Sequence, residues 1–210
     1  MKKIIFAVLI SVSIIYSQVD ISGGMGINFV SSPSLKDYIN GNYNQGGEKL
    51  NAFSSSVEFF GEITYSLNSN FELGVDYGLS IFSYNSSSGN GGIYDLNYTM
   101  QKPTLVAYYV IPGEGYKFKF GGGAGIRMID LDEKIIVEQN YSSTGYGFLA
   151  RAEGHTKLGG DVYAYVGTDL RYDMPGKPEN DNGKLAENSS YDVDLNTFSW
   201  GIKLGVSLFL

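Results

Sequence analysis

His155 is the only histidine in the sequence and the side chain best suited to acid–base chemistry near neutral pH. Glu153 and Lys157 stand two positions before and after it, so the three side chains share one face if the segment is extended. A triad of serine, histidine and acid would need a serine beside the histidine. Lys157 occupies the position where such a serine is sought. We therefore interpret His155 as part of a polar network in the protein interior, with a catalytic role as the alternative.

Two other patterns resemble ligand sites but lack the spacing that those sites need. The run Gly121-Gly122-Gly123-Ala124-Gly125 opens no helix and lacks the Gly-Lys-Ser/Thr ending of a phosphate-binding loop, so it favours close packing or bending of a strand. The segment 173–194 is rich in acids, but their spacing matches no EF-hand. Because cysteine is also absent, we expect no metal, no cofactor and no disulfide.

The composition indicates strands and argues against nucleic acid as a partner. The chain has 210 residues, the size of one domain after removal of a leader, and a formal net charge of −7. Surfaces that bind nucleic acid are usually basic, because they neutralise phosphates. The 28 glycines and 17 tyrosines are typical of short strands and turns rather than of helices.

Apolar and polar residues alternate along the chain, as they do in strands with one polar and one apolar face. This alternation predicts eight strands, at Val19–Val30, Phe53–Leu67, Phe71–Tyr84, Leu96–Ile111, Tyr116–Ile129, Gly145–Leu158, Asp161–Tyr172 and Leu195–Leu210.

The connections between these segments alternate in length. The short ones are Asn68-Ser69-Asn70, Pro112-Gly113-Glu114-Gly115 and Gly159-Gly160, which are typical of tight turns. The long ones are Ser31–Ala52, Asn85–Asp95, Asp130–Thr144 and Asp173–Asp194. The alternation predicts an antiparallel up-and-down barrel with the short turns at one end and the long loops at the other. In the first long loop, Leu35, Tyr38, Ile39 and Leu50 suggest a short helix or a cap over the barrel mouth.

Most charged residues within the strands fall on the polar face. In the second segment, Glu58 and Glu62 alternate with Val57, Phe59 and Ile63. Acids and bases on this face are nearly equal in number, as a closed interior requires, because an unpaired buried charge is strongly unfavourable. The fourth segment is too uniformly apolar for its faces to be assigned. We expect an internal charge network of Glu58, Glu62, Glu72, Asp76, Lys117, Lys119, Arg127, Arg151, Glu153, His155, Lys157, Asp169, Arg171 and Lys203.

The alternation alone does not say which face points outward, since a soluble barrel of the lipocalin type has its apolar face inward. The charge balance favours a barrel that spans a membrane with its apolar face outward. Aromatic residues near the strand ends favour it too, because they would form girdles at the two membrane surfaces. We expect Phe29, Phe53, Tyr98, Tyr146, Phe148 and Tyr172 at one rim, and Tyr65, Phe71, Tyr109, Tyr116 and Phe118 at the other.

The first residues have the pattern of a secretory signal peptide. Met1-Lys2-Lys3 is positively charged, and an apolar run follows from Ile4 to Ile15. That run is shorter than the ~20 residues of a membrane-spanning helix, which makes a membrane anchor the lesser alternative. We expect a signal peptide over residues 1–17 and a barrel domain over residues 18–210.

The whole mature chain resembles the small outer-membrane barrels of the OmpA transmembrane domain, OmpX and OmpW type. The resemblance lies in the strand number, the alternating connections and the last strand, Phe198–Leu210, whose apolar residues at every second position are similar to the signal that these families present to the barrel-assembly machinery. Leu210 departs from the pattern, because these families usually end on Phe, and Phe209 falls on the other face. The resemblance implies an eight-stranded transmembrane β-barrel in the cell outer membrane with both termini periplasmic.

The side chains of an eight-stranded barrel fill its interior, which argues against a diffusion porin. We expect a non-enzymatic integral outer-membrane protein that contributes to membrane integrity or presents its loops to an extracellular ligand. Its expected partners are outer-membrane lipid and the barrel-assembly machinery.

Two other functions stay open. The OmpW-like resemblance allows a narrow conduit for small apolar molecules, with Phe60, Phe82 and Tyr84 lining an apolar outer mouth. His155 also allows a lipid-modifying enzyme. However, the lipid-modifying barrel families act at the outer leaflet, and His155 lies near the Gly159-Gly160 turn at the opposite end.

Overall fold

A computed structural model describes residues 18–42, 54–87, 93–186 and 193–210 of the chain. The expected signal peptide over residues 1–17 lies outside the described residues, as do Leu50 and Phe53.

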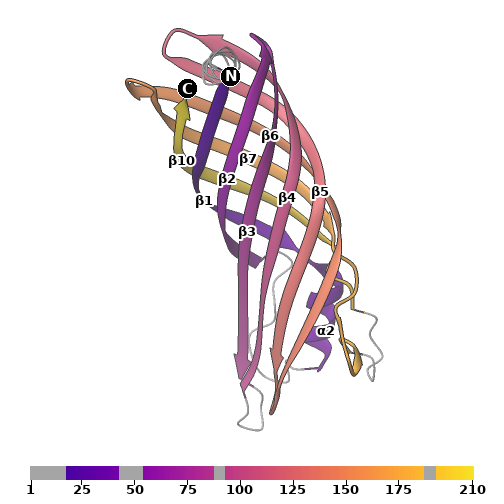
Figure 1. Cartoon of the computed structure of the whole chain (residues 1–210). Helices are drawn as coiled ribbons and strands as arrows, with labels where there is room; N and C mark the ends of the chain where they lie inside the picture. Colours follow the sequence, from indigo (N-terminus) through magenta and orange to yellow (C-terminus); the bar gives the residue numbers. More distant parts are fainter. Residues whose placement is uncertain (1–17, 43–53, 88–92, 187–192) are drawn as a thin grey trace, which may run out of the picture.

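The described residues form a closed antiparallel barrel (Figure 1). Each barrel strand pairs with the next one along the chain, including β5 with β6, and the first strand, β1, pairs with the last, β10, to close the ring. This arrangement confirms the eight-stranded up-and-down barrel that the alternation predicts. The strands are β1 (Val19–Ser31), β2 (Ser54–Asn68), β3 (Phe71–Ser87), β4 (Ile93–Gly113), β5 (Tyr116–Lys134), β6 (Glu138–Gly159), β7 (Val162–Met174) and β10 (Thr197–Phe209).

Three tight turns lie at one end of the barrel, which we call the turn end; β1 begins and β10 ends there (Figure 1). Gly115 and Gly160 have φ angles of +79° and +55°, which glycine adopts without the steric cost of a Cβ. The short connections identified in the sequence are therefore turns.

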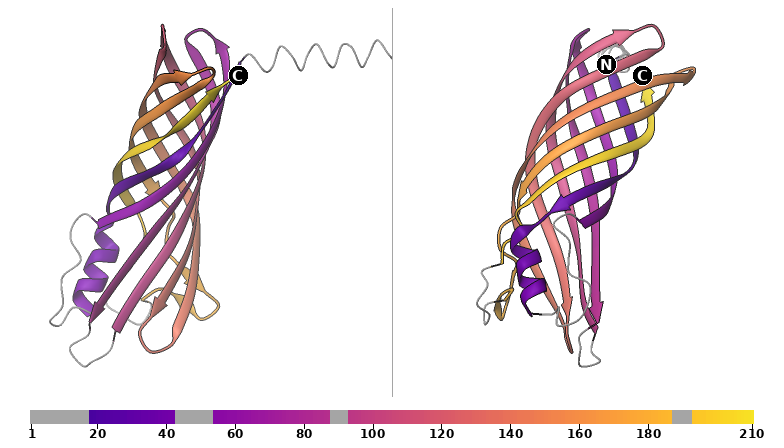
Figure 2. Two further views of the ribbon diagram at one scale, coloured as in Figure 1. Left: turned by 90° about the vertical axis from the view of Figure 1, so that its left-hand side faces the viewer. Right: turned by 180° about the vertical axis from the view of Figure 1, so that it is seen from behind.

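The opposite end, which we call the loop end, carries helix α2 (Pro33–Asn42) and a small hairpin of β8 (Glu179–Asn180) and β9 (Gly183–Lys184). Figure 2 shows α2 beside the barrel wall at this end, as the suggestion of a short helix in the first loop implied. Among the described residues, no helix is long and apolar enough to cross a membrane.

The predicted loop Asp130–Thr144 is wrong in its extent. Strand β5 continues to Lys134 and β6 begins at Glu138, so only three residues separate them. The strands β3 and β4 are also longer than predicted. Together, the strands β3 to β6 form a wall that extends beyond the ends of β1 and β2 at the loop end (Figure 2).

The outward surface is apolar around the middle of the barrel and becomes polar along the wall. Exposed side chains such as Val75, Leu105 and Ile126 occupy the middle. Nearer the loop end, one row of register partners on β3, β4, β5 and β6 consists of Ser83, Asn97, Asp132 and Asn140. The soluble lipocalin-type alternative, with its apolar face inward, does not fit this arrangement.

Aromatic residues sit on the outward face at both edges of the apolar belt. Phe29 and Trp200 stack with ring centroids 4.5 Å apart near the loop end, and Phe71 and Tyr109 make an edge contact near the turn end. Tyr98, expected in the girdle, instead points inward and stacks on Phe82. The sequence does not show which residues of β4 point inward, so the prediction of an outward Tyr98 is wrong.

Candidate functional site

The barrel interior is the candidate site, because it contains nearly all of the charged residues that the alternation assigns to it. Of the fourteen residues expected there, all are buried except Lys117, which is half-buried at the turn end, and Lys157, which is exposed. The pleat explains the result, since successive side chains of a strand point to opposite faces.

The placement of Lys157 in the network is wrong. The register of β6 shifts between Lys157 and Gly159, where the strand approaches its turn. The backbone N–H of Lys157 donates to Gly115 of the neighbouring turn at 2.8 Å, which places this residue on the rim rather than inside. Lys157 keeps the strand register of His155, but it lies at the end of β6, where its side chain is exposed.

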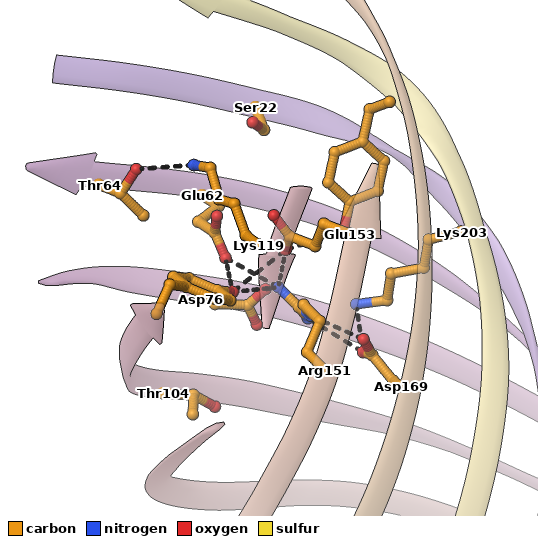
Figure 3. A network of polar contacts seen from close by, with 12 residues as sticks. Ser22, Glu62, Thr64, Asp76, Thr104, Lys119, Arg151, Glu153, Asp169 and Lys203 are labelled. Carbon is orange, nitrogen blue, oxygen red and sulfur yellow. Dashed lines mark hydrogen bonds and ion pairs between the residues drawn. The ribbon is translucent and has the colours of Figure 1, made fainter. Parts of the chain in front are cut away.

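Arg151 on β6 is the centre of the network (Figure 3). Its Nε and Nη2 donate to the two carboxylate oxygens of Asp169 at 2.6 and 3.0 Å. Its Nη1 lies 2.7 Å from Asp76 and 2.8 Å from Glu62. Tyr108 also donates to Glu62, at 2.5 Å. The planar guanidinium thus joins acids from three other strands, which a point charge would do less well.

A second group of ion pairs lies between Arg151 and the loop end, around Glu58. Lys203 Nζ lies 2.5 Å from Glu58 and 2.9 Å from Asp169, so it links this group to the first. Arg171 lies 3.5 Å from Glu58, and Lys102 donates to the same carboxylate. Each of these charges is buried, and each has an opposite charge within ion-pair distance, as a dry interior requires.

A third group lies near the turn end, where two lysines of β5 bridge two acids. Lys119 is 3.0 Å from Asp20 and 2.6 Å from Glu72, while Lys117 is 2.7 Å from Asp20 and 3.1 Å from Glu72. The Phe209 ring lies 4.0 Å from Lys117 Nζ, so the inward side chain of the last strand helps to cover this end.

Several members of the network were missed by the sequence analysis. Lys102 lies on the strand whose faces could not be assigned, and Asp173, which pairs with Arg127, was placed in a loop. Asp20 lies on the first strand, where the alternation is weak. A usable signal existed at Asp173, because it continues the alternation Asp169, Arg171.

Glycines make room for the longest inward side chains. A Cβ on Gly121 would lie 2.5 Å from the ring of Tyr108, and one on Gly147 would lie 2.5 Å from Arg127 Nε. The glycine run on β5 therefore serves close packing between strands, as the absence of a phosphate-loop pattern suggested.

His155 has a serine partner that sequence spacing did not reveal. Its Nδ1 lies 3.0 Å from Ser207 Oγ, and its Nε2 lies 3.2 Å from Glu153 Oε2. Ser207 belongs to β10, two strands away from β6 around the ring. Ser207 is 0% exposed, His155 1% and Glu153 2%. The Ser207 hydroxyl also forms a hydrogen bond with the Ser22 hydroxyl at 2.8 Å. A substrate cannot reach a serine so enclosed, so the geometry fits a hydrogen-bond network better than nucleophilic catalysis.

An apolar cluster, which we call the cap, fills the loop end of the lumen. Leu35, Tyr38 and Ile39 of α2 pack against inward side chains of the wall. Phe82 belongs to the cap and Tyr84 packs against it, but Phe60, expected at the same mouth, lies deeper, with its ring 4.7 Å from Lys203 Nζ. The remaining members include Tyr94, Leu96, Tyr98, Met100, Ile129, Leu131, Tyr141, Leu185, Val193 and Leu195.

Beside the cap, a groove of about 720 Å³ opens between the end of the β5–β6 hairpin, α2 and the β8–β9 hairpin. Glu133 lines it and is 5% exposed. Its Oε1 accepts hydrogen bonds from the hydroxyls of Tyr38, at 2.8 Å, and Tyr94, at 3.0 Å. Burial raises the pKa of the Glu133 carboxyl above its ordinary value, although the two hydroxyls act in the opposite direction. Glu133 is absent from the expected network, because the sequence predicts a loop over its segment, Asp130–Thr144.

In the described part of the chain, no group of three or more histidine and acid side chains is placed to hold a metal ion. The acids of the segment 173–194 that fall within it include Asp173, which is paired inside the barrel. Glu187 and Asp192 lie outside the described residues.

Comparison with known proteins identifies the architecture. No family model and no curated protein matches the sequence. Among solved structures, the chain is similar to neisserial surface protein A (TM-score 0.50, 14% identity, 91% of this chain and 97% of that one). It is also similar to Ail of Yersinia pestis (0.49, 12%, 91% and 99%) and to the outer-membrane protease OmpT of Escherichia coli (0.49, 10%, 92% and 96%). The likeness to the neisserial protein confirms the predicted fold, that of the small outer-membrane β-barrels.

Proposed function

We propose that the chain is a non-enzymatic integral protein of the outer membrane, closed to solutes, which presents its loop end to the cell exterior. The outward apolar belt supports this location, since an exposed apolar surface of this extent needs lipid to cover it. The polar outward row Ser83, Asn97, Asp132 and Asn140 marks the level at which the wall leaves the membrane. The turn end would then be periplasmic, with both termini.

The observation that carries this proposal is the filled lumen. Ion pairs around Arg151, Glu58 and Lys119 occupy successive levels of the interior, and the apolar cap closes the loop end above them. The conduit alternative would use the apolar residues of the mouth as its lining. In the structure Phe82 and Tyr84 belong to or pack against the cap that includes α2, and Phe60 lies deeper beside Lys203, so these residues fill the lumen rather than line a passage.

A catalytic function would most simply use Ser207, His155 and Glu153, and their burial speaks against it. A lipid substrate would also have to reach them near the turn end, away from the outer leaflet. Because a barrel of this type can support unrelated activities, this argument rests on the site and not on the fold.

The proposal is tested by planar-bilayer conductance of refolded Gln18–Leu210, after a gel-mobility shift on boiling has shown that the barrel is folded. We expect folded protein without discrete openings. Steady openings of the folded protein would overturn the closed-lumen proposal and favour the conduit. As a control for the enzyme alternative, cells with His155→Ala should have the same outer-membrane lipid profile as cells with the unsubstituted protein.

A further inference from the structure

Glu133 differs from the other buried acids of the described residues, because no lysine, arginine or histidine within the described part of the chain lies within ion-pair distance of it. Inside the barrel, each of the buried acids is paired, for example Asp169 with Arg151 and Asp173 with Arg127. Glu133 has only the hydroxyls of Tyr38 and Tyr94, both bonded to Oε1. A buried carboxylate without a counter-charge is unfavourable unless a cation is supplied from elsewhere.

The groove beside Glu133 has the size and composition of a small-molecule site. Its volume of about 720 Å³ lies within the range of about 300–1,000 Å³ that is usual for ligand pockets. Ile135, Ile136 and Val137 line one side and remain exposed, Ile136 by 89%. Tyr38 and Tyr141 also line the groove, and tyrosine rings attract organic cations. The groove therefore combines one unpaired acid with apolar and aromatic surface.

We propose that this groove binds an organic ammonium group attached to an apolar chain, with the ammonium paired to Glu133 and the chain against Ile135, Ile136 and Val137. Such a group occurs both in free alkylamines and in the lysine side chain of a peptide. The inference deepens the proposed function, and rests on it only in taking the loop end to face the exterior.

The protonation of Glu133 should control the binding. The other titratable groups that line the groove or contact Glu133 are Tyr38 from α2, Tyr94 from β4, Tyr141 from β6 and Lys184 from β9. Glu133 is the carboxyl among these groups, so we expect acidification to act on the groove through this side chain. Since an ammonium prefers the ionised carboxylate, its affinity should fall as the pH is lowered through the raised pKa of Glu133.

The test is calorimetric titration of the folded protein, in a neutral glycoside detergent, with butylamine and with butanol as the uncharged match. We expect butylamine to bind at least about tenfold more tightly than butanol, and Glu133→Gln to remove that preference. Glu138→Gln is the matched control, because Glu138 is an exposed acid on the same hairpin outside the groove. A second arm compares a blocked Gly-Lys-Gly peptide with Gly-Gln-Gly. Binding of the lysine peptide identifies a peptide source, and binding of butylamine alone identifies a free amine.

The outcomes separate this inference from the proposed function, because binding is measured without a membrane and does not depend on conductance. Equal affinity for butylamine and butanol, no binding of either, or an unchanged preference in Glu133→Gln would overturn the inference and leave Glu133 as an anchor for α2. If Glu133→Gln does not give the mobility shift of a folded barrel, Ile136→Ser decides. Its side chain is exposed, and the substitution should abolish the stronger binding of hexylamine over butylamine.

Discussion

At the scale of single residues, Arg151 shows why each buried charge of the interior needs its opposite charges. It is buried and pairs with Asp169, Asp76 and Glu62, which come from three other strands. Removing its charge would leave these acids close together in a dry interior, with Lys203 and Arg171 as the nearest remaining partners of Asp169. A buried ion pair adds modest stability as a whole, but losing one partner is costly, because the other charge stays desolvated.

We predict that Arg151→Met lowers the free energy of unfolding by about 3–5 kcal/mol, the range typical of a buried pair that loses one partner. The measurement is urea unfolding of the barrel in lipid vesicles, followed by tryptophan fluorescence. Lys157→Met is the matched control, and because Lys157 is exposed at the rim we expect it to change stability little. Equal stability of the two variants would mean that the interior charges do not depend on one another as the structure indicates.

The network expected from the sequence and the one observed differ at single residues. Alternation places Glu58, Arg151 and Lys203 inside correctly, because a period of two is a property of every strand. It does not reveal Ser207 beside His155, because their contact depends on how strands far apart in sequence are tilted and paired. It fails at Lys157, because this residue lies at the end of its strand beside a turn, where its side chain is exposed. The alternation along one strand can thus be recognised in the local sequence, whereas the contacts between inward side chains of different strands cannot.

At the scale of elements, the β5–β6 hairpin explains why a strand was mistaken for a loop. Its outward residues beyond the apolar belt are polar, such as Asp132 and Asn140, so the segment looks like a hydrated connection. The inward residues nevertheless continue the alternation with Leu131, Glu133 and Tyr141, all buried. The helix α2 covers this inward face, and the sequence signal for it was the spacing of Leu35, Tyr38 and Ile39, which lie on one face of a helix.

We predict that Ile39→Asp releases α2 from the wall without unfolding the barrel. Ile39 is fully buried in the cap, so an acid there would be desolvated and unpaired. Hydrogen exchange of the α2 amides should accelerate, while the mobility shift on boiling stays that of the folded protein. Asp37→Asn, on the exposed side of the same helix, is the control and should leave exchange unchanged.

The variant Ile39→Asp also shows whether the cap or the ion pairs of the interior close the barrel. Because the ion pairs around Glu58 and Arg151 lie between the cap and the turn end, bilayers that contain Ile39→Asp should stay silent. Openings that appear only in this variant would show that the cap alone closes the barrel, and that the charged interior is permeable.

At the scale of the whole molecule, the apolar belt and the asymmetry of the two ends together support the proposed orientation. The turn end has three short turns, whereas the loop end carries α2, the β8–β9 hairpin and the polar wall. Outer-membrane barrels generally have short turns in the periplasm and long loops outside. The orientation could be proposed from loop lengths alone, but the height of the wall could not, because it depends on where the outward face changes from apolar to polar.

The absence of cysteine from the sequence makes this orientation testable with single introduced thiols. Ile136→Cys places a thiol at the exposed end of the β5–β6 hairpin, and Ser69→Cys places one in a tight turn at the other end. We predict that a membrane-impermeant maleimide labels Ile136→Cys in intact cells, and labels Ser69→Cys only after the outer membrane is permeabilised. Both variants should react in detergent, which controls for the accessibility of the thiol itself. The opposite pattern in cells would place α2 and the groove beside Glu133 in the periplasm. The loop end would then be unable to meet an extracellular ligand, even if the barrel is closed and binds amines.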